Sequence, residues 1–183
     1  MQQSVTSRKY NKLIRRRPRT RNIVFAAIAA IALVILLMAL LMPVYRVYGD
    51  AMAPTLHSND IVMSTGSRGV SRGDMVAFYF DNKLLIRRVI GVGGDKVEVD
   101  SYGKVYVNGD SIREPYIEKG TAKITAKMPC KVPDGSFFVM CDNRENGQDS
   151  RNAGVGTIKK KEISGKIVLR IWPPGDMGIF HKG

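Results

Sequence analysis

The sequence predicts a mainly β-sheet domain behind one N-terminal transmembrane helix. Residues 23–42 contain no charged residue, no glycine and no proline. Downstream of this segment, short apolar runs with an alternating pattern are separated by clusters of Gly, Asp, Asn or Pro, which is typical of strands joined by turns. The expected organisation is therefore a basic tail (1–22), a transmembrane helix (23–42) and one β-rich domain (43–183), whose length is enough for a single core.

The apolar segment has the length of a membrane-spanning helix. Twenty helical residues extend roughly 30 Å, which matches the hydrocarbon core of a bilayer. Pro43 lacks a backbone donor and restricts Met42, so the helix is expected to end there. A cleaved signal peptide is the alternative, but its apolar region would be about 7–15 residues long and a small-x-small site would follow. Met42-Pro43-Val44-Tyr45 follows instead, which favours an uncleaved anchor.

The N-terminal tail carries most of the net charge of +13. Residues 1–22 hold eight basic and no acidic side chains, which leaves the rest of the chain at +5. By the positive-inside rule the tail lies in the cytoplasm and residues 44–183 lie outside the cell membrane. A basic tail alone is also compatible with nucleic-acid binding. Beside an apolar span, however, its role is to set orientation and to contact anionic lipid, so the expected partner is the bilayer and not nucleic acid.

The outer region reads as a series of short strands rich in Val, Ile, Tyr and Phe. Asn108-Gly109 is expected to form a tight hairpin turn, because both residues tolerate positive φ angles. The charge run at 158–163 is expected to be a solvated turn or a short helix. The predicted strands are Ile61–Ser64, Met75–Phe80, Lys83–Val92, Lys96–Asp100, Lys104–Val107, Ala122–Ala126, Phe137–Cys141 and Lys166–Ile171.

The cysteines and histidines indicate little specific chemistry. Cys130 and Cys141 lie in a region expected outside the cell, where a disulfide is possible, but the sequence does not say whether the two Cα atoms lie within reach. Cys141 is equally compatible with a small buried side chain in an apolar strand. His57 and His181 are too few and too isolated for a metal site, and no cofactor is expected.

Four segments of the chain carry distinctive sequence boxes. The first reads Gly-Asp-Ala-Met-Ala-Pro-Thr-Leu. It resembles the nucleophile box of the bacterial type I signal peptidases and differs from it by having alanine in place of serine, and the other three segments resemble further boxes of this family in the same order. The last reads Cys-Asp-Asn-Arg-Glu-Asn-Gly-Gln-Asp-Ser-Arg and matches a long family box closely. A closing segment at 165–173 also fits. The four boxes are residues 49–56, 72–76, 86–95 and 141–151.

The resemblance implies an antiparallel β-sheet fold of the signal peptidase type and a membrane-anchored serine endopeptidase. Members of this family cut exported proteins after small-x-small sites, with a serine as nucleophile and a lysine as general base. The strand that carries the lysine also pairs with the extended substrate, a mode that relies on backbone groups. By this resemblance the peptide-binding residues are Asp50, Met52, Pro54, Leu85 and Ile86.

This chain departs from the family at the three chemical positions. The nucleophile position is Ala51, whose methyl group cannot attack a carbonyl. The general-base position is Arg87, and a guanidinium with a pKa above about 12 does not release its proton at working pH. The position of an orienting serine is Gly147. The resemblance assigns supporting roles, through carboxylate–guanidinium pairs that hold a loop, to Asp142, Arg144, Asp149 and Arg151.

These departures favour a signal-peptidase-like protein without the Ser/Lys pair. Non-catalytic relatives of this kind resemble the present chain and help surface-pilus assembly, so exported proteins or pilin subunits are the expected partners. The alternative is an active signal peptidase I carried as an inactivated variant, since alanine is the usual laboratory replacement of a nucleophile. That alternative accounts for Ala51 alone better than for Ala51, Arg87 and Gly147 together. A third hypothesis is a membrane-surface binding module without peptide specificity.

Overall fold

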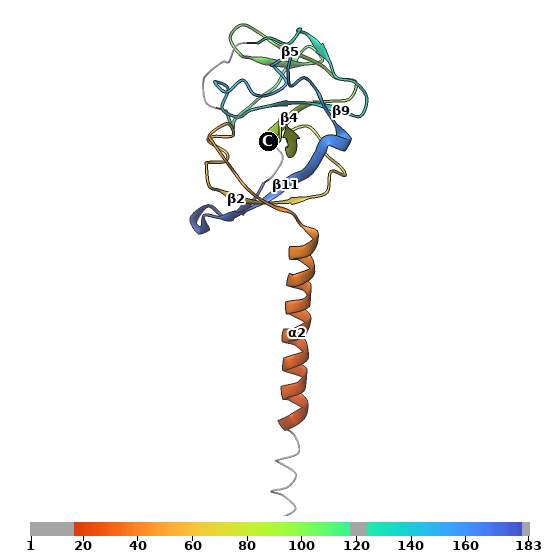
Figure 1. Cartoon of the computed structure of the whole chain (residues 1–183), viewed down its shortest axis with the longest axis vertical. Coiled ribbons are helices and arrows are strands. Elements are labelled where there is room, and N and C mark those ends of the chain that lie inside the picture. The colour runs from red at the N-terminus through yellow and green to blue at the C-terminus, as the bar shows by residue number, and fades with distance from the viewer. Residues whose placement is uncertain (1–16, 118–123, 181–183) are drawn as a thin grey trace, which may run out of the picture. The chain divides into compact units, whose positions relative to one another are not determined.

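The structure is a computed structural model that describes residues 17–117 and 124–180. The chain separates into two compact units, one ending at Leu41 and the other beginning at Met42. The first unit contains helix α2, and the second contains the strands, so the predicted combination of an N-terminal apolar helix with a β domain is confirmed (Figure 1).

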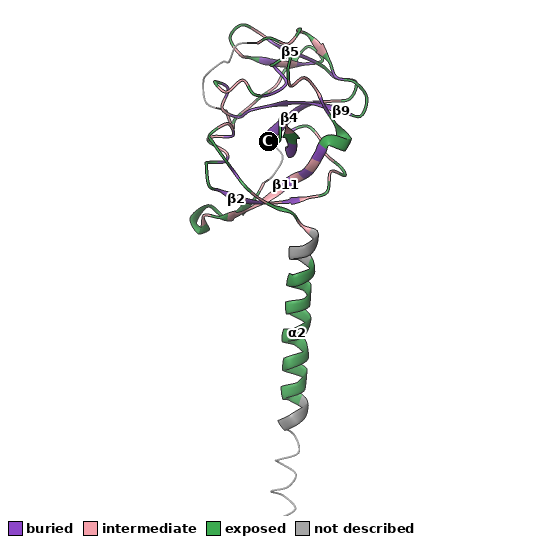
Figure 2. Cartoon of the chain, viewed as in Figure 1, coloured by how far each residue is buried: buried purple, intermediate pink, exposed green. Residues whose placement is uncertain are grey.

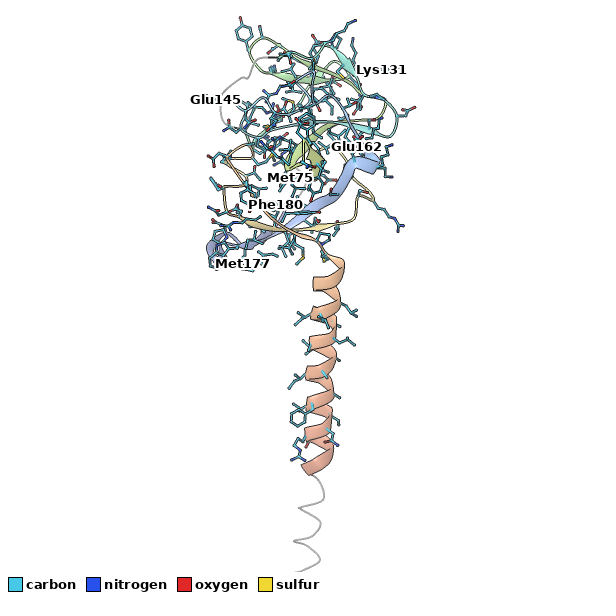
Figure 3. The ribbon with its side chains drawn as sticks, in the orientation of Figure 1. Met75, Lys131, Glu145, Glu162, Met177 and Phe180 are labelled. Atoms are coloured by element: carbon cyan, nitrogen blue, oxygen red, sulfur yellow. The ribbon has the colours of Figure 1, made fainter. Side chains whose placement is uncertain are left out.

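Helix α2 runs from Arg17 to Leu41. Its window Thr20–Leu37 is apolar and long enough to cross a membrane, and every residue in that window is exposed (Figure 2). The side chains drawn on α2 project outward on all sides, whereas those of the β domain crowd together (Figure 3). A helix window that is apolar and exposed on all sides is suited to lipid as its surroundings. The helix ends two residues before Pro43, as the sequence predicts.

Antiparallel pairing builds the larger sheet, whose strands follow the order β1-β2-β11-β3-β4-β9-β10, with β12 paired to β11. Strand β11 is the long element that joins β2 to β3. The short helix η1 (Lys160–Glu162) precedes it and η2 (Pro174–Asp176) follows it. The strands are β1 Val44–Arg46, β2 Ile61–Thr65, β3 Met75–Phe80, β4 Lys83–Val92, β9 Ser136–Met140, β10 Ile158–Lys159, β11 Ile163–Trp172 and β12 Gly178–Ile179.

The smaller sheet has the order β7-β6-β5-β8. Val107 pairs with Asp110 across the turn, and Asn108 and Gly109 have φ angles of 57° and 94°, so the predicted hairpin turn is confirmed. The bounds are β5 Lys96–Val99, β6 Val105–Val107, β7 Asp110–Ser111 and β8 Cys130–Lys131.

Three hydrophobic clusters form the core of the β domain. One cluster joins the two sheets, with Val97 and Val107 of the smaller sheet packed against Phe138 and Met140 of β9. The sheets lie close together at Gly91, where an added Cβ would lie 2.5 Å from a methyl group of Val97. Each fully buried aliphatic or aromatic side chain contributes about 1.5–3 kcal/mol, so these clusters supply much of the stability that holds the loops in place.

One predicted strand is wrong. Residues 122 and 123 lie outside the described residues, and 124–126 form no strand. The backbone N–H groups of Thr125 and Ala126 both donate to the carbonyl of Arg151, so this segment is bound to a loop and not to a sheet. The charge run at 158–163 contains the exposed helix η1 as expected, but its two isoleucines are buried in β10 and β11.

Candidate functional site

A pocket of about 210 Å³ lies between the loop that follows β1 and the first half of β4. Residues 46–52 form one wall and residues 84–87 form the other. The loop before Asp149 closes the third side through Asn146 and Gln148. The lining residues are Arg46, Val47, Tyr48, Gly49, Asp50, Ala51, Met52, Leu84, Leu85, Ile86, Arg87, Asn146 and Gln148.

The loop that carries Ala51 is held at its base and from beneath. At the base, the N–H of Val47 donates to the carbonyl of Asp60, at an N–O distance of 2.8 Å. Beneath, the side chains of Met52 and Leu56 are 1% and 0% exposed and pack in the same cluster as Ile86 of β4. Burial of Val47, Met52 and Leu56 therefore holds the loop in place, with Ala51 among the residues that line the pocket.

The 141–151 loop supports the same segment from its other side. The backbone N–H of Asn143 donates to the carbonyl of Ala51 at 3.1 Å, and its amide Nδ2 donates to the carbonyl of Asp50 at 3.3 Å. The hydroxyl of Thr55 donates to Oδ2 of Asp142 at 2.5 Å. Two boxes that lie 87 residues apart in the chain thus form one hydrogen-bonded unit.

A buried ion pair extends this unit to β4. Arg88 donates to the two carboxylate oxygens of Asp142 at 2.8 Å and 2.5 Å, and the two side chains are 4% and 0% exposed. Its guanidinium also lies over the ring of Tyr116, 4.0 Å from the centroid. Burial raises the pKa of Tyr116 well above its ordinary value, with the carboxylate of Glu114 adding to the rise. Neither Arg88 nor Tyr116 was predicted from the sequence, because only the tertiary structure brings Arg88 to Asp142 and Tyr116 to Arg88.

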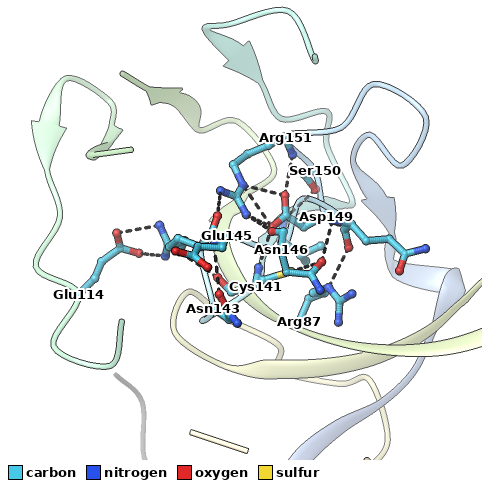
Figure 4. A network of polar contacts seen from close by, with 12 residues as sticks. Arg87, Glu114, Cys141, Asn143, Glu145, Asn146, Asp149, Ser150 and Arg151 are labelled. Carbon is cyan, nitrogen blue, oxygen red and sulfur yellow. Dashed lines mark hydrogen bonds and ion pairs between the residues drawn. The ribbon is translucent and has the colours of Figure 1, made fainter. Parts of the chain in front are cut away.

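The other three predicted supporting residues lie in one network (Figure 4). Arg151 forms an ion pair with Asp149 in which Nη2 donates to Oδ2 at 2.7 Å, and both side chains are fully buried. Asp149 in turn accepts from the backbone N–H of Cys141 at 2.8 Å. Arg144 pairs with the carboxylate of Glu114, which the sequence did not indicate. These pairs connect residues of the 141–151 loop with one another and with Glu114.

Arg87 differs from the other buried arginines. The residue is 4% exposed. Its Nε donates to the carbonyl of Gln148 at 2.9 Å, and its Nη1 donates to the carbonyl of Ile86 at 2.6 Å. Among the described residues no carboxylate lies within 4.0 Å of it. Arg88, Arg144 and Arg151, in contrast, each have an acidic partner.

The thiol of Cys141 lies beside this site and is buried, which disfavours the thiolate that a replacement nucleophile would need. Burial raises the pKa of Cys141 to about 12, so the thiol stays protonated. Its Sγ lies 3.7 Å from the side-chain oxygen of Asn146. Cys130 is also a free thiol, and the disulfide that the sequence left open is not formed.

The pocket brings together most of the residues predicted for the site. Ala51 and Arg87 line it with four of the five predicted peptide-binding residues, Asp50, Met52, Leu85 and Ile86. Pro54 is exposed and lies outside the lining, and Gly147 sits between two lining residues without lining the pocket itself. No role was predicted for Arg46, Tyr48, Leu84, Asn146 or Gln148, although all five line the pocket and lie within or close to the sequence boxes.

Strand β4 presents an unpaired edge to the pocket. Lys83–Arg88 pairs with β3 on one side, but pairing with β9 on the other side begins only at Arg88. Within the described part of the chain, no strand pairs with Leu84–Arg87 from the pocket side. An open edge of this kind is a template for an added extended segment.

The comparisons with known proteins agree with the motifs. The family profile described as "Signal peptidase, peptidase S26" matches residues 19–172. The chain belongs to the signal peptidase family. Signal peptidase I S of Bacillus subtilis (strain 168) is 36% identical over 83% of this chain and 89% of its own length. Signal peptidase IB of Staphylococcus aureus is 36% identical over 70% and 77% of the two chains. A crystal structure of a signal peptidase I from Enterococcus faecalis V583 aligns at 28% identity with a TM-score of 0.47, over 54% of this chain and 97% of that one.

The family to which the chain belongs is one of serine peptidases. Helix α2, together with the similarity of the chain to signal peptidases I, indicates a membrane-anchored protein. The groups that line its pocket nevertheless limit the chemistry available there. Ala51 offers a methyl group, and Arg87 offers a permanent cation. This pocket therefore presents hydrogen-bond donors and positive charge, and neither a hydroxyl at residue 51 nor a proton acceptor at residue 87.

Proposed function

We propose that this signal peptidase family member is non-catalytic and holds extended segments of exported proteins, pilin subunits among them, at the outer surface of the membrane. The observation that carries the proposal is the meeting of Ala51 and Arg87 in one pocket beside the unpaired edge of β4. A strand edge that could pair with a peptide lies beside the pocket, whereas residues 51 and 87 supply neither the serine hydroxyl nor the lysine amine that cleavage requires. The Ser/Lys mechanism of the family therefore stops before its first step in this chain.

The chemical part of the proposal rests on two atoms. Covalent catalysis at residue 51 requires a hydroxyl oxygen, which alanine lacks. Proton abstraction at residue 87 requires a neutral nitrogen, and arginine remains protonated with a pKa above about 12 even when buried. Gly147 supplies no side chain that would orient a base. Loss of all three groups favours a lasting absence of catalysis over a single inactivating change.

The binding part rests on how much of the frame remains. Three ion pairs and the hydrogen bond from Thr55 to Asp142 fix the loops around the pocket, and the Asp149–Arg151 pair among them is fully buried. The edge of β4 offers main-chain groups that are independent of the catalytic side chains. With the basic tail in the cytoplasm, the positive-inside rule places this edge on the extracytoplasmic side, where exported proteins emerge.

Cleavage assays test the chemical part. The full chain in detergent is mixed with a peptide that contains a small-x-small site, with an active signal peptidase I as the positive control. No product above the uncatalysed background is expected. Cleavage by the unaltered chain would refute the proposal outright.

The double variant Ala51→Ser/Arg87→Lys distinguishes a native loss of the Ser/Lys pair from an inactivated variant of an active enzyme. A long-standing loss is expected to leave this variant inactive, because the rest of the site has adapted to a guanidinium and to Gly147. Robust cleavage after only two substitutions would support the alternative, a signal peptidase I carried as an inactivated variant. The single variant Arg87→Lys serves as the matched control that restores a base without a nucleophile.

Deletion of the gene in its host tests the assembly role. If the chain helps to assemble a surface polymer, loss of the gene is expected to reduce the length or amount of pili on the cell surface. Complementation with the unaltered chain restores the polymer, and the same result is expected with the Ala51→Gly variant, since residue 51 has no catalytic task. Normal polymer in the deletion strain would exclude the pilus role.

A further inference from the structure

The guanidinium of Arg87 has hydrogen-bonding capacity that the protein does not use. Arginine has five N–H donors, and Arg87 directs two of them to the carbonyls of Gln148 and Ile86. Nη2 of Arg87 has no hydrogen-bond partner among the described residues. Every fully enclosed side-chain nitrogen or oxygen in that part of the chain does have a partner, so Nη2 is not enclosed and is open to the pocket that Arg87 lines. The remaining donors are therefore available to a ligand.

The charge around the pocket favours an anionic ligand. Its charged lining residues are Arg46, Arg87 and Asp50, which leaves a net positive charge. Asp50 is exposed and forms no ion pair with either arginine. A buried cation without a counter-charge is costly, and the three other buried arginines of the domain all have one. An incoming anion would supply the missing counter-charge to Arg87.

The position of Arg87 on β4 indicates that a peptide ends here. Phe80 and Lys83 pair across the two-residue turn at Asp81-Asn82, so the main-chain groups of Lys83, Leu85 and Arg87 face β3. Those of Leu84 and Ile86 consequently face the open edge.

One of these edge groups, the carbonyl of Ile86, already accepts a hydrogen bond from the guanidinium of Arg87. Its Nη1 lies 2.6 Å from the carbonyl oxygen of Ile86. A peptide strand that continued past Ile86 would require that acceptor for its own ladder of hydrogen bonds. A peptide whose last residue reaches this point would instead meet the free N–H groups of the guanidinium with its terminal carboxylate, in the planar geometry that arginine and carboxylate share.

We propose that the pocket is a receptor for a peptide carboxylate, and specifically for the C-terminal carboxylate of an extended chain added to the edge of β4. The inference rests on the proposed peptide-holding function and names its ligand. The volume of about 210 Å³ agrees with a chain end, because pockets for drug-sized ligands measure about 300–1,000 Å³. Ala51 contributes by leaving space where a longer side chain would project.

Three labelled peptides that differ only at their last residue test this assignment. The first ends in a free carboxylate after a small-x-small sequence, the second ends in an amide, and the third is an amide whose last residue is aspartate. Fluorescence anisotropy measures their binding to the full chain in detergent. The free acid is expected to bind at least about tenfold more tightly than either amide, the difference that one charge-assisted pair supplies.

Two variants assign the difference to Arg87. Arg87→Gln is expected to abolish the preference for the free acid while retaining the affinity for the plain amide, which also reports that the domain is folded. Lys83→Gln is the matched control, because it removes an exposed cation from the same strand outside the pocket and should leave the preference unchanged.

The outcomes separate this inference from the proposed function. Equal binding of the free acid and the plain amide to the unaltered chain would overturn the carboxylate receptor and leave peptide holding intact. Binding of the aspartate amide as tightly as the free acid would overturn the chain-end assignment in favour of a side-chain carboxylate. Binding of none of the three peptides would overturn peptide holding itself.

Discussion

Substitution of Arg88 by glutamine tests whether the buried pair with Asp142 holds the Ala51 loop in place. The change removes three donated hydrogen bonds to Asp142 and Thr55 and one to the carbonyl of Gly73 at 2.9 Å. It leaves the carboxylate of Asp142 fully buried, with the hydroxyl of Thr55 as its remaining side-chain donor. The contact with the ring of Tyr116 is lost as well.

The expected cost follows from the burial of both partners. Removing one member of a buried ion pair costs about 3–5 kcal/mol, because the other charge stays desolvated without compensation. That is a large part of the stability of a typical domain, which is about 5–15 kcal/mol. With a urea dependence of about 1–3 kcal/mol per molar, the unfolding midpoint is expected to fall by about 1–5 M.

Urea titration of the full chain in detergent, followed by circular dichroism of the β-sheets, measures the shift. Arg72→Gln is the matched control, since Arg72 forms an ion pair with Asp95 at 2.9 Å but its side chain is 45% exposed. Because the arginine of this pair is largely solvated, its loss is expected to cost only about 0–1 kcal/mol. A shift for Arg88→Gln no larger than that of the control would refute the reasoning. So would a double-mutant cycle with Asp142→Asn that gave no coupling between the two positions.

Three further predictions concern the same domain. Gly91→Ala should destabilise it by about 1–3 kcal/mol, because the new methyl would overlap Val97, and thermal unfolding measures this. At pH 8 a thiol reagent should modify Cys130 first and reach Cys141 only on unfolding, since burial raises the pKa of Cys141 to about 12; equal rates would contradict this. For Asp95, burial opposes ionisation, but hydrogen bonds from the Val92 N–H and two side chains outweigh it and lower its pKa. The stability that it contributes is present above the unfolded pKa and disappears as the pH falls through the lower folded value, so Asp95→Asn should lose stability at pH 7 and show a shallower decline below about pH 4 in pH-dependent urea titrations.

Local patterns predicted the strands better than the contacts between them. Strands β3 and β4 have the predicted bounds, because their apolar runs are long and the turn residues between them are clear. The failed segment at 124–126 has similar composition, but the carbonyl of Arg151 binds its backbone. Strand β10 and the start of β11 were missed because the lysines between their buried isoleucines dominate the sequence pattern.

The residues of the site were identified mainly through the family boxes, and their roles depend on the structure. Sequence placed Asp142 and Asp149 among the supporting residues but did not indicate their partners. Asp142 binds Arg88 and Asp149 binds Arg151. Glu114, the partner of Arg144, lies outside every box and was therefore missed. Distance along the chain hides such pairs, since an ion pair forms wherever folding brings two charges within about 4 Å.

By itself, the sequence determined that the chain has an apolar membrane-length helix, a β domain of the signal peptidase family, and alanine and arginine at residues 51 and 87. These are properties of residue type and spacing, which side-chain chemistry and helical or strand periodicity set locally. Only the tertiary structure decided that both residues face one pocket, that no described strand pairs with β4 beside it, and that no carboxylate among the described residues forms an ion pair with the buried Arg87. Those properties depend on which distant segments pack together, because burial and counter-charge are supplied by neighbours in space and not by neighbours in sequence.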